Sequence, residues 1–95
     1  MIRHVSLITF AEDADLTEFE AALATLPARL PIRNYQVGRD AGINQGNASF
    51  AVVADFDSVA DYLQYRDDPE HQRILKELAG PMLVARTVVQ YEIDG

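Results

Sequence analysis

The stretch that decides the fold is the first predicted strand, Ile2-Arg3-His4-Val5-Ser6-Leu7-Ile8-Thr9-Phe10. Its short run of β-branched and aromatic residues is typical of a β-strand, in which successive side chains point to opposite faces. One face carries His4, Ser6, Ile8 and Phe10, and the other carries Val5, Leu7 and Thr9. Because both faces hold apolar side chains, we expect each face to be covered by other parts of a protein.

The segment that follows predicts a helix. Asp15 with Glu18 three residues later is typical of a capping box at a helix N-terminus. A single apolar stripe then falls at helical spacing and consists of Leu16, Phe19, Leu23 and Leu26. Pro27 and Pro31 are expected to end this helix.

Two strands are predicted next, over roughly 34–39 and 49–56, with a turn at 42–47 between them that is rich in glycine and asparagine. We expect these strands to form a hairpin. Asp57 or Ser58 is a suitable cap for a helix after the hairpin, and residues 84–93 have the composition of a last strand.

A second helix start lies inside this last helical region. Asp68 is a preferred N-cap residue, Pro69 suits the first helical position, and Glu70 places negative charge in the first turn. The helix that begins there carries His71 on the same face as Ile74, Leu75 and Leu78 and is closed by Gly80-Pro81. The helical region is therefore expected to break in two at Asp68.

The predicted element order is βαββαβ, which favours an α+β, ferredoxin-like fold: a four-stranded antiparallel sheet with helices on one face. Residues 1–95 are expected to form one domain. The other face of the sheet would expose Val5, Leu7, Ala51 and Val53 unless a second copy of the chain covered it. A homodimer with sheet packed on sheet is therefore expected.

Composition excludes several classes of protein. The chain has 8 basic and 15 acidic residues and a net charge of −7, so neither a nucleic acid nor an anionic membrane is an expected partner. It has no cysteine, which excludes disulfides, thiolate catalysis and cysteine-based metal sites. The N-terminus lacks the pattern of an export signal and there is no long apolar run, so a cytoplasmic location is expected.

The chain resembles the stress-responsive A/B barrel (Dabb) family, part of the dimeric α/β-barrel superfamily. The resemblance runs nearly end to end through Met1 to Leu7, Tyr35 to Asp40, Val52 to Phe56, Tyr65 to His71 and Val89 to Ile93. It implies a ferredoxin-like protomer, a homodimer and a small-molecule pocket. Cyclase members of the family use a tyrosine and a histidine at the positions of Tyr65 and His71. Many relatives have a second histidine where this chain has Asp68.

The candidate catalytic residues are His71, Tyr65 and His4. The resemblance turns the strand face of His4 toward the helices, so these side chains are expected to border one apolar cavity. Its walls are expected to include Ser6, Ile8, Phe10, Phe19, Val59 and Ile74. The positive end of the helix dipole disfavours imidazolium at His71, which favours base chemistry near neutral pH. The alternative for both histidines is a packing role in the core.

Two functions remain open. The first is cofactor-independent proton transfer, of the cyclase or isomerase kind, on an aromatic or polyketide-like carbonyl compound, with His71 as base and Tyr65 as hydroxyl donor. The second is a non-catalytic stress-response or ligand-binding dimer. With two histidines and no cysteine, a closed metal site is not expected, and no motif for a nucleotide or redox cofactor is present. Four phenylalanines are large enough to fill the expected cavity: Phe10, Phe19, Phe50 and Phe56.

Overall fold

The computed structural model describes residues 1–94 and has the element order βαββαβ, as predicted. The strands are β1 (Ile2–Phe10), β2 (Arg33–Arg39), β3 (Phe50–Phe56) and β4 (Leu83–Glu92). The helices are α1 (Thr17–Leu23), α2 (Val59–Asp67) and α3 (Pro69–Arg73). Short 3₁₀ turns span Leu26–Ala28 and Gly80–Met82, and a π-helical stretch, Ile74–Ala79, continues α3. The predicted ferredoxin-like arrangement is confirmed.

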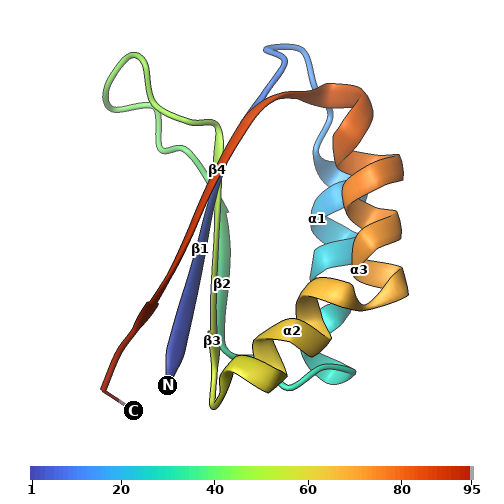
Figure 1. Ribbon diagram of the computed structural model, residues 1–95. Coiled ribbons are helices and arrows are strands. Elements are labelled where there is room, and N and C mark those ends of the chain that lie inside the picture. The colour runs from blue at the N-terminus through green and yellow to red at the C-terminus, as the bar shows by residue number, and fades with distance from the viewer. Residues whose placement is uncertain (95) are drawn as a thin grey trace.

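The strands form one antiparallel sheet in the order β2-β3-β1-β4, with all three helices on one face (Figure 1). β1 is central, and its buried residues alternate with partly exposed ones because successive side chains of a strand face opposite sides. The helix-facing row is His4, Ser6, Ile8 and Phe10, each at most 5% exposed. The same row therefore contributes two polar and two apolar side chains to the layer between sheet and helices.

Aromatic side chains fill the end of this layer near Phe10. Phe10, Phe19 and Phe50 pack edge to face, with ring centroids 5.4 to 6.3 Å apart. All members of the predicted helical stripe are buried with them, namely Leu16, Phe19, Leu23 and Leu26.

The first helix differs at both ends from its prediction. It begins at Thr17, and the carboxylate of Asp15 accepts a hydrogen bond from the Thr17 N–H at 3.0 Å, so the expected capping box with Glu18 does not form. It ends at Leu23, four residues before Pro27, so proline does not stop it. The chain tightens into a 3₁₀ turn instead, which keeps Leu26 in the core.

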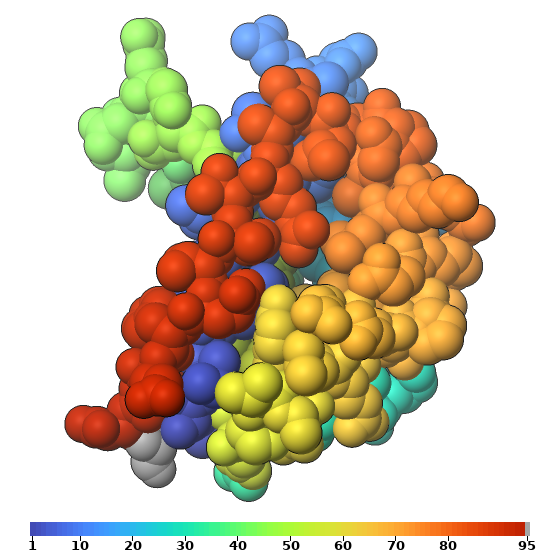
Figure 2. Space-filling model, in the orientation of Figure 1, coloured from blue at the N-terminus to red at the C-terminus, as the bar shows by residue number. Residues whose placement is uncertain are grey.

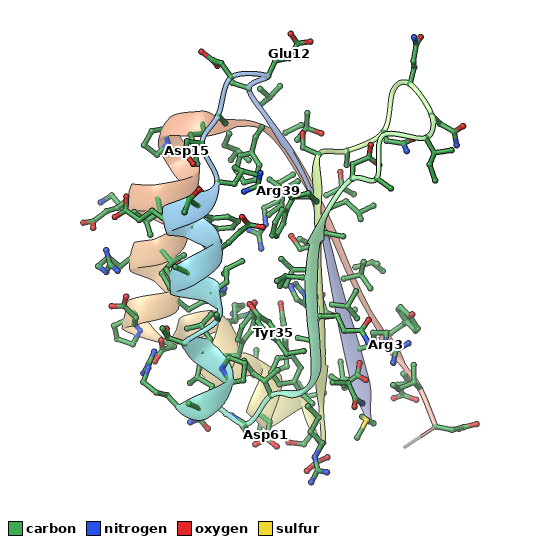
Figure 3. All side chains as sticks on the ribbon, turned by 180° about the vertical axis from the view of Figure 1, so that it is seen from behind. Arg3, Glu12, Asp15, Tyr35, Arg39 and Asp61 are labelled. Carbon is green, nitrogen blue, oxygen red and sulfur yellow. The ribbon has the colours of Figure 1, made fainter. Side chains whose placement is uncertain are left out.

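No part of residues 1–94 covers the face of the sheet opposite the helices. Leu7, Val89 and Tyr91 are 45%, 53% and 46% exposed there. Asp55 lies on this face but is fully buried, because Arg3 binds its two oxygens at 2.8 and 2.9 Å and the Asn34 amide donates a third hydrogen bond at 2.8 Å. Figure 3 shows Arg3 pointing away from the helices and Tyr35 pointing toward them.

A loop between β2 and β3 projects from the body of the protein (Figures 1 and 2). Asp40 fixes its base by accepting hydrogen bonds from the Gly42 N–H and the Asn47 amide, both at 3.0 Å. Within residues 1–94, no helix is long and apolar enough to cross a membrane.

The aromatic cluster generates a prediction about stability. We expect Phe19→Ala to lower the free energy of unfolding by about 3–5 kcal/mol, because it leaves a cavity among rings that cannot close around it. Val59→Ala is the control, since Val59 is 58% exposed and its truncation is expected to cost at most about 0.5 kcal/mol. Urea unfolding at one fixed protein concentration measures both, and similar losses would contradict the packing described above.

Candidate functional site

A cavity of about 250 Å³ lies between β4, the centre of the sheet and the second helical region. The helical region supplies Tyr62, Tyr65, Arg66, His71, Gln72 and Leu75, and the sheet supplies His4, Arg86 and Val88. Figure 2 shows the surface hollowed between β4 and the helices α2 and α3. The phenylalanine cluster occupies the other end of the layer, so it leaves this space open.

The break between α2 and α3 sets the position of His71. Asp68 has an extended backbone (φ −58°, ψ 127°), and its carboxylate accepts a hydrogen bond from the His71 N–H at 2.9 Å, as expected of an N-cap. Arg29 binds the same carboxylate at 3.0 Å. The carboxylate of Asp68 therefore stabilises the first turn of the helix that carries His71.

Tyr65 and His71 lie against each other on the two sides of this break. Each is 3% exposed, and their ring centroids are 4.1 Å apart with 30° between the planes. The Nδ1 atom of His71 is 3.4 Å from the carbonyl oxygen of Arg66. With the proton on Nδ1, facing that carbonyl, the Nε2 atom of His71 carries a free lone pair.

His4 is 2% exposed and contacts the tyrosines from the sheet. Its ring centroid is 5.4 Å from that of Tyr62 and 5.8 Å from that of Tyr65. The side-chain amide of Gln90 donates to Nδ1 of His4 at 2.8 Å, which leaves the ring proton of neutral His4 on Nε2. His4 thus takes its hydrogen-bond partner from β4.

Burial keeps both histidines neutral. Burial, together with the smaller effect of the positive charge of Arg86, lowers the pKa of His4 to about 4. Burial also lowers the pKa of His71, although the carbonyls of Arg66 and Tyr65 act in the opposite direction. Burial raises the pKa of Tyr65 to about 12, so its hydroxyl keeps its proton at neutral pH. The site therefore combines two uncharged imidazoles with a protonated phenol.

The structure brings His4, Tyr65 and His71 together at this cavity. The other predicted wall residues lie elsewhere. Ile8, Phe10, Phe19 and Ile74 are buried in the core, away from the cavity lining. Val59 is exposed because it begins α2 on the helix surface. Ser6 is buried next to the lining and accepts a hydrogen bond from Nε of Arg86 at 3.1 Å.

Sequence reasoning missed the contributions of β4 and of Tyr62 to the cavity. Arg86 and Gln90 are polar residues four apart on a strand that is otherwise largely apolar, with Val88 between them on the same face. This spacing of two polar residues on one strand face was the sequence signal that could have identified Arg86 and Gln90 as neighbours of the site. Their register opposite Ile8 and His4 depends on the sheet order and could not be read from the strand alone.

The described residues suit acid–base chemistry better than metal binding. Within residues 1–94, no group of three or more histidine and carboxylate side chains is placed to hold a metal ion. The cavity instead offers a neutral imidazole and a protonated phenol whose ring centroids lie 4.1 Å apart. These groups can take a proton from a ligand and donate a hydrogen bond to it.

Comparison with known proteins identifies sequences and folds similar to those of this chain. The chain matches the model of the stress-responsive A/B barrel domain over residues 2–93. A dimeric ferredoxin-like protein of unknown function from Thermobifida fusca is 35% identical, with a TM-score of 0.86 over 97% of this chain and 90% of that one. A second such dimeric protein, from Bacteroides fragilis, is 30% identical, with a TM-score of 0.78 over 97% and 95%.

More distant structures share the fold alone. Hydroxynitrile lyase from Passiflora edulis is 22% identical, with a TM-score of 0.81 over 98% of this chain and 93% of that one. The comparison with curated proteins gave no match. The family match over residues 2–93 confirms the resemblance found in the sequence: this chain belongs to the stress-responsive A/B barrel (Dabb) family.

Proposed function

We propose that this protein is a homodimer whose cavity binds a small hydrophobic carbonyl compound, aromatic or polyketide-like, and catalyses proton transfer on it without a cofactor. The observation that carries the proposal is the contact between Tyr65 and His71, both buried at one cavity, with ring centroids 4.1 Å apart. A neutral imidazole can act as the base in enolisation, and a protonated phenol beside it can donate a hydrogen bond to the enolate oxygen.

In this proposal the Nε2 atom of His71 takes a proton from the carbon next to the ligand's carbonyl group. The electron pair of the broken C–H bond forms a C=C bond while the carbonyl electrons move to oxygen. The hydroxyl of Tyr65 donates a hydrogen bond to that oxygen, and His4 orients the ligand through its Nε2–H. Return of the proton to another carbon isomerises the ligand. Alternatively, attack of the enolate carbon on a second carbonyl closes a ring, and the alkoxide formed from that carbonyl takes the proton from His71.

The bare face of the sheet supports the dimer. This apolar face, on which Leu7, Val89 and Tyr91 are about half exposed, is unfavourable in water. The same face of a second copy of the chain can cover it, as in the twofold dimers that are the commonest oligomers. The relatives from Thermobifida fusca and Bacteroides fragilis are described as dimeric.

A non-catalytic ligand-binding dimer is the second candidate. The planes of Tyr65 and His71 are 30° apart, so the two rings stack face to face more than they present their edges to the cavity. Such stacking also serves a packing role.

The first test is turnover. We expect the wild-type protein to accelerate deuterium exchange or cyclisation in a panel of aryl ketones, β-polyketones and lactones, followed by NMR. His71→Ala and Tyr65→Phe are each expected to slow it by about 10²- to 10⁴-fold, the usual contribution of one acid–base group. Lys76→Gln, on the exposed helix surface, is the control and should leave the rate unchanged. Absence of turnover, or turnover that survives both substitutions, would favour the ligand-binding dimer.

The second test is pH dependence. His4 ordinarily titrates near 6.5 and has a folded-state pKa of about 4, so the unfolded chain binds more protons than the folded protein between these values. Stability should therefore fall as the pH drops from about 6.5 to about 4, by at most about 3 kcal/mol from this residue. Urea unfolding at pH 7 and pH 5 should show a smaller loss for His4→Gln than for wild type. An imidazole NMR signal of His4 that titrates near 6.5 would refute its burial as a neutral base.

The third test is assembly. We expect sedimentation to give a dimer at micromolar concentration and Leu7→Asp to give a folded monomer, because an unpaired charge in a buried interface costs several kcal/mol. Val59→Asp is the matched control, since Val59 is similarly exposed but lies on the helix side. A wild-type monomer, or equal effects of the two substitutions, would contradict the face-to-face dimer.

A further inference from the structure

Arg86 is a charged residue at the cavity to which the proton-transfer mechanism assigns no role. It lies on β4 and lines the cavity together with both histidines and Tyr65. Its Nε atom donates a hydrogen bond to the Ser6 hydroxyl at 3.1 Å. This partner is neutral and does not balance the charge of Arg86. This bond fixes the guanidinium on the sheet and leaves the two terminal nitrogens, Nη1 and Nη2, for another acceptor.

The pairing of Arg86 differs from that of every other arginine in the chain. The other six each form an ion pair with a carboxylate: Arg3 with Asp55, Arg29 with Asp68, Arg33 with Asp57, Arg39 with Glu20, Arg66 with Asp67, and Arg73 with Glu70 and Glu77. Among residues 1–94, no carboxylate lies within ion-pair distance of Arg86. Two arginines line the cavity, and Arg86 is the one for which residues 1–94 provide no carboxylate partner.

The surroundings of Arg86 do not neutralise its charge. The cavity lining holds no aspartate or glutamate, and its polar groups are imidazoles, phenols, an amide and the already paired guanidinium of Arg66. The charge of Arg86 also acts on its neighbours, since it lowers the pKa of both histidines. An anion that entered the cavity would therefore find one fixed, unpaired positive charge.

We propose that Arg86 selects the ligand by binding a carboxylate, so that the substrates of this site are small aromatic or conjugated carbonyl compounds that also carry a carboxylic acid group. The carboxylate accepts hydrogen bonds from Nη1 and Nη2 of Arg86, and the body of the ligand extends toward Tyr65 and His71. A volume of about 250 Å³ suits a compound with one ring. The claim that the carbonyl end of the ligand reacts at Tyr65 and His71 rests on the proposed function. The preference for an anionic ligand can be measured by binding alone, without turnover.

The experiment compares two probes of equal size, salicylate and salicylamide, which differ in charge. Binding is measured by titration calorimetry and located by NMR shifts of the His4 and His71 rings. We expect the wild type to bind salicylate at least about tenfold more tightly than salicylamide, the factor that a charge-assisted hydrogen bond supplies. We expect Arg86→Gln to bind the two probes alike and Arg86→Lys to keep part of the preference, because lysine retains the charge but not the planar fork.

Arg73→Gln removes one positive charge from the exposed helix surface, away from the cavity, and controls for the net charge of the protein. It should keep the full preference for salicylate. Unchanged circular dichroism of each variant shows that it is folded. The proposal is overturned if wild type does not bind salicylate, if it binds the two probes equally, if the preference survives in Arg86→Gln, or if the histidine rings do not respond. If the wild type shows no preference for salicylate but does turn over neutral ketones, this inference is wrong and the proposed function is still supported.

Discussion

The structure depends on one row of side chains in β1, which must bury polar and apolar groups side by side beneath the helices. Its apolar half, Ile8 and Phe10, joins the aromatic core. Its polar half, His4 and Ser6, is equally buried and needs hydrogen-bond partners there. Both partners come from the neighbouring strand: Gln90 for His4 and Arg86 for Ser6. The hydrogen bonds that permit this burial also bring β4 into the site.

The fold could be predicted from the sequence because its signals are local. The alternation in residues 2–10, the loop composition at 42–47 and the Asp68-Pro69 helix start each depend on a few neighbouring residues, and the structure has all three. The ends of α1 could not be predicted in the same way. Asp15 satisfies the Thr17 N–H two residues on, and this competes locally with the capping box.

The candidate site was predictable only where the family resemblance reached it. Tyr65, His71 and His4 meet at the cavity, but the apolar residues expected around them mostly pack in the core. Strand alternation shows which face a side chain is on, and it does not show whether that part of the layer is filled or open. Phe10, Phe19 and Phe50 cluster at one end of the layer, while Phe56 packs against Tyr62 and Tyr65 at the end near His4, where the cavity remains open.

The place of β4 at the edge of the sheet has a consequence for how such a protein can evolve. β4 pairs with β1 on one side only, and the residues that it contributes to the cavity, Arg86 and Val88, are partly open to solvent within the protomer. Exchanging Val88 costs little folding free energy because few neighbours must repack, whereas exchanging Arg86 also removes the hydrogen-bond partner of the buried Ser6. The buried imidazoles and phenol can stay in place while the edge strand varies. The architecture thus separates the buried polar groups of the cavity from the solvent-exposed positions of β4 that also line it.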